Sequence, residues 1–81
     1  MKNVNYAKVE DIYKAYAILW KTIALYKEML KAKTDSFTNA MIQLRMDGAE
    51  SKLSTLNALD NKGKGNIDKK FIESILYKYG N

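Results

Sequence analysis

Residue types that commonly carry chemistry or form turns are missing or scarce. The chain of 81 residues has no cysteine, no histidine and no proline, and only four glycines. Without cysteine, it can form no disulfide, no thiolate zinc site and no cysteine nucleophile. Without histidine, it lacks the commonest general base and the commonest metal ligand. Ser-His and Cys-His catalytic pairs are therefore excluded.

The acidic residues do not suggest a catalytic centre either. The nine Asp and Glu are scattered along the chain, and Glu10 and Asp11 are their only adjacent pair. An active site needs titratable groups gathered in defined roles, and no such grouping is visible in this sequence. We therefore expect no enzymatic activity, no cofactor and no bound metal.

The scarcity of glycine and proline favours a few long helices over a sheet with many hairpins. The longest apolar run, residues 15–20, is far shorter than the ~20 residues needed to cross a bilayer. The first four residues, from Met1 to Val4, lead into charged positions without the apolar core of a signal peptide. We expect one soluble, cytoplasmic domain spanning residues 1–81, with no membrane partner.

Apolar residues recur at helical spacing between Tyr6 and Lys33, with Asn3 or Asn5 as the candidate cap. Their steps alternate between three and four residues, the spacing of a seam between packed helices. The seam consists of Val9, Ile12, Tyr16, Leu19, Ile23, Tyr26 and Leu30. A second stripe beside it consists of Tyr13, Ala17, Trp20 and Ala24. An apolar face this wide needs more than one partner helix.

A second helix is predicted from Phe37 towards Leu59, after the cap-type residues Thr34, Asp35 and Ser36. Its apolar positions again step by four and three: Ile42, Met46, Ala49, Leu53 and Leu56. Residues 42–46 also alternate between apolar and polar before Asp47-Gly48, which resembles a strand entering a turn. Helix is favoured because these residue types prefer it and no strand-like segment follows the turn. Gly48 is a candidate kink or break.

Residues 61–66 contain two glycines and predict a loop. Asp68 is the predicted N-cap of a third helix from Lys69 to Tyr79, with Ile67 packing onto Ile72 as a hydrophobic staple. The predicted buried stripe of this helix is Phe71, Ile72, Ile75, Leu76 and Tyr79, and Gly80 ends it.

The segment from Asp60 to Asp68, with an apolar helix on each side, resembles the calcium loop of an EF-hand. Gly65 and Ile67 stand at the turn glycine and the loop-pairing aliphatic residue of that family, and Asp60 and Asp68 match its first and ninth positions. Two positions depart from the pattern, since Lys62 and Lys64 replace oxygen ligands. Phe71 also replaces the closing glutamate. The resemblance implies a partner-binding module that works without calcium.

Lysines dominate the charge of the chain, which is +5 overall. They neutralise phosphates without reading sequence, whereas base readout favours arginine, and Arg45 is the only one here. Because a helix N-terminus also attracts phosphate, the lysines near the start of the third helix are the candidate nucleic-acid or anion contacts. They are Lys62, Lys64, Lys69 and Lys70.

We expect an all-α protein, a long helical hairpin with a short C-terminal third helix. Two long helices and one short helix cannot fully cover both stripes of the first helix, so we predict a bundle completed by oligomerisation, most simply a homodimer. The predicted oligomer or partner interface consists of Val9, Ile12, Tyr16, Leu19, Trp20, Ile23, Tyr26 and Leu30.

The leading functional hypothesis is a small non-catalytic protein-interaction module: a regulator, an inhibitor or an assembly component, of phage or mobile-element type. Two alternatives stay open. One is a basic dimer that binds nucleic acid. The other is the EF-hand-like module that holds a protein partner without calcium. The sequence does not name the partner.

Overall fold

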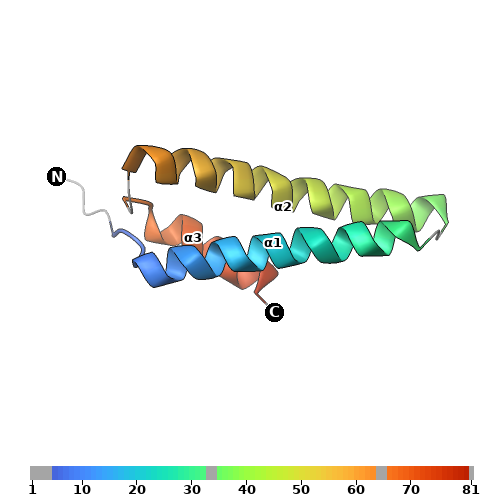
Figure 1. The fold of residues 1–81 in the computed structure, drawn as a ribbon, viewed down its shortest axis with the longest axis horizontal. Helices are drawn as coiled ribbons and strands as arrows, with labels where there is room; N and C mark the ends of the chain where they lie inside the picture. The colour runs from blue at the N-terminus through green and yellow to red at the C-terminus, as the bar shows by residue number, and fades with distance from the viewer. Residues whose placement is uncertain (1–4, 33–34, 64–65, 81) are drawn as a thin grey trace.

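The computed structural model describes residues 5–32, 35–63 and 66–80, and these residues form three α-helices (Figure 1). Helix α1 spans Val9–Lys31, α2 spans Ser36–Gly63 and α3 spans Lys69–Tyr79. α1 and α2 form a long antiparallel hairpin, and α3 lies beside the end of the hairpin where α1 begins and α2 ends. The predicted all-α class and the order of two long helices and one short helix are confirmed.

Two aspartates cap the helices that follow the turns. The Asp35 carboxylate accepts a hydrogen bond from the Thr38 backbone N–H at 2.7 Å, at the start of α2. The Asp68 carboxylate accepts one from the Lys70 N–H at 3.0 Å, at the start of α3, as predicted. Each carboxylate satisfies a backbone donor that has no partner within its own helix.

α1 begins later than its apolar pattern suggested. Its N-cap is Lys8, whose side chain makes no capping hydrogen bond, so the prediction of Asn5 as the cap was wrong. Asn3, the other candidate, lies outside the described residues. The Asn5 carbonyl instead accepts a hydrogen bond from the Lys69 N–H at 2.8 Å. The residues just before Val9, which the apolar pattern assigned to the helix, therefore pair with the residues before α3 instead.

That pairing is a short antiparallel bridge between the residues before α1 and the residues before α3. Tyr6 and Asp68 are its central pair, and the Ala7 N–H donates to the Ile67 carbonyl at 2.8 Å. Ile67 is fully buried at this point. The bridge fixes the start of α3 against the start of α1.

α2 is continuous through residues 42–48, which excludes the strand alternative and any break at Gly48. It also continues through Gly63, so the loop predicted over residues 61–66 was wrong for residues 61–63. Adding residues 61–63 to the helix is favourable because α2 already has more than six turns on which to add. Residues 64 and 65 lie outside the described part.

The core lies where the three helices meet. Its largest fully buried side chains are Leu19, Leu56, Ile67, Ile72 and Ile75. Ile67 and Ile72 belong to the same buried cluster, which agrees with the predicted staple. The molecule measures 51 × 22 × 21 Å, and α3 is too short to follow the hairpin to its turn. Among the described residues, no helix has the combination of length and apolar character that a membrane crossing requires.

Candidate interaction surfaces

The predicted interface of α1 is divided between the core and the surface. Ile12, Leu19 and Ile23 are buried inside the chain's own core. Tyr16, Tyr26 and Leu30 are half-buried and pack against that core. Val9 and Trp20 are exposed by 57% and 65% of their surface. Most of the 3.5-residue seam therefore packs α1 against α2 and α3 within the chain.

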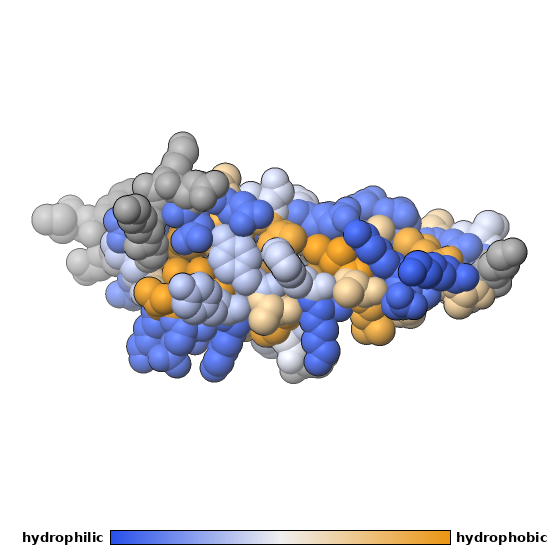
Figure 2. Space-filling model, viewed as in Figure 1, coloured by the Kyte–Doolittle hydropathy of each residue, from blue (hydrophilic) through white to orange (hydrophobic). Residues whose placement is uncertain are grey.

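The first candidate surface is the outer face of α1, formed by Val9, Tyr13 and Trp20. Tyr13 is 68% exposed, so two aromatic rings and a branched aliphatic side chain face outward. Beside Trp20 is a shallow hollow that Leu53 of α2 also lines. Figure 2 shows hydrophobic side chains forming an interrupted band along the hairpin, with hydrophilic side chains on both sides.

Helical geometry explains why this face stays outside. Trp20 follows the buried Leu19 directly, so the two side chains point about 100° apart around the helix axis. α2 and α3 cover the arc around Leu19, whereas α2 reaches only the edge of the arc of Trp20, through Leu53. The second apolar stripe of the sequence thus becomes the exposed stripe of the structure.

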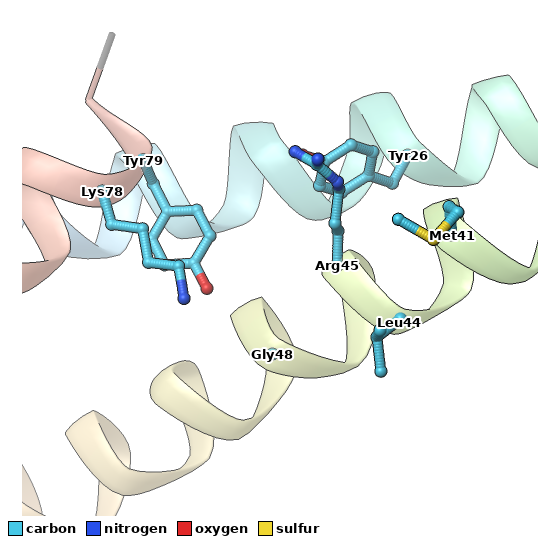
Figure 3. Close-up of a pocket in the computed structure, with 7 residues that line it drawn as sticks. All are labelled: Tyr26, Met41, Leu44, Arg45, Gly48, Lys78 and Tyr79. Carbon is cyan, nitrogen blue, oxygen red and sulfur yellow. The ribbon is translucent and has the colours of Figure 1, made fainter.

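The second candidate surface is a groove between the halves of α1 and α2 nearest their connecting turn, which we call the distal groove (Figure 3). It has a volume of about 460 Å³. The described residues that line it are Tyr26, Met41, Leu44, Arg45, Gly48, Lys78 and Tyr79. Leu44 is 67% exposed and Met41 is 40% exposed, so apolar side chains here face solvent.

The last turn of α3 closes one end of the distal groove. The Tyr79 ring projects from α3 toward α2 beside Gly48 (Figure 3). A Cβ added to Gly48 would lie 3.4 Å from the Tyr79 hydroxyl oxygen. The Lys78 ammonium lies 5.7 Å from the centre of the Tyr79 ring, within range of a cation–π contact. α3 therefore fills the first half of the interhelical groove and leaves the second half open.

The distal groove was not predicted from the sequence, although α2 carries a signal for it. Phe37, Met41, Leu44 and Gly48 step by four, three and four along α2. They form a second stripe beside the one that carries Ile42 and Ala49. The pattern of α2 is thus two-sided, as that of α1 is.

The candidate anion contacts are only partly within the described side chains. Lys69 and Lys70 are exposed at the start of α3. The Lys69 ammonium lies 3.9 Å from a Glu73 carboxylate oxygen, both on exposed side chains. The Asp68 carboxylate already occupies the N-terminus of α3. The side chain of Lys62 and all of Lys64 lie outside the described structure.

The resemblance to a calcium loop does not extend to the backbone. Asp60, its first candidate ligand, lies within α2, and its carboxylate accepts a hydrogen bond from the Tyr16 hydroxyl at 3.2 Å. Burial and the negative charge of Asp60 raise the pKa of Tyr16 above its ordinary value. Asp68 is held as the cap of α3. Within the described part of the chain, no three acidic side chains gather where they could hold a metal ion.

No protein-family model, curated protein or solved structure shows significant similarity to the chain.

Proposed function

We propose that the protein is a small non-catalytic interaction module that associates with a second copy through the outer face of α1. In this role it serves as a regulator, an inhibitor or an assembly component. The observation that carries the proposal is the exposure of Trp20, which is 65% accessible although it directly follows the fully buried Leu19. The cytoplasmic location predicted from the sequence stays a prediction.

The energetics support this surface as an interface. Large aromatic side chains dominate interface energies, and tryptophan and tyrosine are the residues most enriched at binding hot spots. Tyr13 lies before Trp20 on the same exposed face of α1, and Val9 extends this face toward the start of the helix. Pairing two such faces around a symmetry axis removes both aromatic stripes from water and completes a larger helical bundle.

The outer face also explains why self-association does not require unfolding. Ile12, Leu19 and Ile23 stay in the core of each chain, so the folded monomer docks as a unit. The half-buried Leu53 supplies a contact from α2 at the edge of the same surface. The proposed interface therefore uses Val9 and Trp20, the two residues of the predicted interface that the folded chain leaves exposed, together with Tyr13.

Light scattering tests the proposal. The parent chain at micromolar concentration should give twice the chain mass of 9.3 kDa, and a Trp20→Glu variant should give the single-chain mass. The matched control is Tyr77→Glu, which changes an aromatic residue of α3 that is 84% exposed. Its mass should equal that of the parent. A parent chain that stays monomeric at these concentrations would refute self-association.

Of the two alternatives, nucleic-acid binding would use lysines whose nearest helix N-terminus already carries a carboxylate, that of Asp68. The EF-hand-like alternative would need a loop from Asp60, which α2 occupies. These observations favour the interaction module. Binding to nucleic acid stays a prediction that salt-dependent measurements decide.

A further inference from the structure

The interhelical groove of the hairpin is only half filled by the chain itself. α3 has 11 residues and is roughly 16 Å long, whereas α2 has 28 residues and is roughly 42 Å long. Beyond Tyr79, the groove continues as the distal groove, where Leu44 and Met41 are exposed. Apolar side chains that line an open groove of this kind are what a bound amphipathic helix contacts.

We propose that the distal groove binds an amphipathic α-helix of a protein partner, with aspartate and glutamate side chains flanking its apolar stripe. This inference rests on the proposed function, because it names the class of partner that an interaction module takes. It uses a surface other than the outer face of α1. The two proposals can therefore fail separately.

The shape of the groove selects a helix. In its first half, α3 packs along α1 through Ile72 and Ile75, which are spaced as neighbours on one helix face. A partner helix placed end to end with α3 would lay the same kind of stripe between α1 and α2. Binding of an amphipathic helix in an apolar groove is a recurrent mode of recognition. Met41 suits such a surface because its flexible thioether side chain adapts to the partner.

The charge of the groove selects an acidic helix. Arg45 and Lys78 line it, and none of its described lining residues is a carboxylate. Arg45 comes from α2 and Lys78 from α3, so the two cations lie on different walls (Figure 3). Carboxylates on either side of an apolar stripe would meet these cations, which steers association and sets the orientation of the bound helix.

The same charge argues against a second copy as the occupant. Among the described residues, the short amphipathic helix that a second copy could offer is α3, and it carries three lysines and one glutamate. Like charges across an interface disfavour association. A partner of opposite charge fits the groove.

Tyr79 and Gly48 shape the inner end of the site. Because Gly48 has no side chain, the surface of α2 is recessed at this point, and the Tyr79 hydroxyl lies close to the helix there. The ring forms an end wall against which the first turn of a partner helix can pack. The Tyr79 hydroxyl also offers a hydrogen-bond donor at that wall.

A labelled peptide tests the proposal directly. The probe is an acetylated, amidated helical peptide of about 14 residues, the length of the distal half of the hairpin, locked by a lactam bridge. It has leucines on one face and glutamates on both flanks, and a matched peptide has glutamine in place of each glutamate. By fluorescence anisotropy near 0.15 M salt, the glutamate peptide should bind with Kd below ~100 μM, at least about tenfold tighter than the glutamine peptide.

Variants of the chain locate the binding. Reversing Arg45→Glu and Lys78→Glu together should weaken binding of the glutamate peptide at least about tenfold. Leu44→Gln should weaken it by removing apolar contact. The matched control reverses two exposed lysines outside the groove, Lys8→Glu and Lys14→Glu, and should bind the peptide within about twofold of the parent.

Several results would overturn the proposal. Equal binding of the two peptides would show that charge does not select the partner. Binding that survives the reversal of Arg45 and Lys78, or that is unaffected by Leu44→Gln, would place the peptide elsewhere. Displacement of the peptide by a DNA duplex of similar affinity would show a general polyanion surface. The Trp20→Glu variant should still bind the peptide, so loss of self-association alone leaves this proposal standing.

Discussion

Replacing Gly48 with alanine should stabilise the protein. Gly48 lies in the interior of α2, where glycine costs about 1 kcal/mol relative to alanine because it loses more backbone freedom on folding. The added Cβ would lie 3.4 Å from the Tyr79 hydroxyl oxygen, which is an ordinary van der Waals contact. No clash therefore offsets the gain, and we expect the free energy of unfolding to rise by about 1 kcal/mol.

Thermal unfolding followed by circular dichroism measures this gain. For a domain of this size, 1 kcal/mol corresponds to a rise in Tm of about 4–8 °C. The matched control is Ala40→Gly, an exposed position in the same helix, which should lower Tm by a similar amount. The double variant should melt close to the parent, because the two sites are roughly 12 Å apart along α2 and act independently.

The outcome decides whether α2 is one regular helix. If Gly48→Ala melts below the parent while Ala40→Gly behaves as expected, then Tyr79 packs more tightly than the contact distance indicates, or the helix is interrupted at residue 48. Either result would refute the reasoning. A gain in Tm would also show that the low surface at Gly48 has a cost in stability, as expected where the groove serves binding.

Four further predictions follow from the core, the cap, a titrating tyrosine and the lysines. Leu56→Ala, at a fully buried position, should lower the free energy of unfolding by about 2–5 kcal/mol in urea denaturation, and a smaller loss would mean a looser core. Asp68→Ala should cost about 1 kcal/mol by removing the cap of α3, whereas Asp68→Asn should keep most of it. The pKa of Tyr16 is raised in the folded state. The stability that Tyr16 contributes is therefore present below the unfolded pKa of 10.0 and is lost as the pH rises through the folded value. Tyr16→Phe should abolish this alkaline dependence of Tm. Finally, no duplex should bind tighter than ~100 μM near 0.15 M salt; a tighter complex whose log K falls against log salt with a slope of roughly −3.6 would instead support four phosphate contacts. Replacement by glutamine should then remove most of this slope when it is made at four lysines together: Lys62, Lys64, Lys69 and Lys70.

The sequence determined the elements of this fold because their signals are local. The periodic apolar residues around Leu19 and Ala49 require no distant neighbour to favour a helix, and they predicted α1 and α2. Asp68 marked the start of α3 because a carboxylate satisfies backbone donors only two residues ahead. Where two local signals competed, at residues 42–46, helix propensity decided correctly.

Contacts between residues far apart in the sequence set where the helices begin and end and which of their faces are buried. α1 starts at Val9 because the chain before it pairs with residues that lie some 60 positions later, and no local pattern contains that pairing. Near the end of α2, Asp60 bonds Tyr16, a residue 44 positions earlier. Neither long-range contact could be read from the spacing of residues.

The division between core and surface depended on tertiary structure in the same way. Leu19 and Trp20 belong to neighbouring apolar stripes, and nothing in their spacing tells which one faces inward. α2 and α3 cover the arc of Leu19 and bury it completely, while Trp20 stays 65% exposed. The distal groove likewise exists only because α3 ends at Tyr79, halfway along the hairpin. Burial is a property of what packs against a helix, and that is settled only when all three helices are in place.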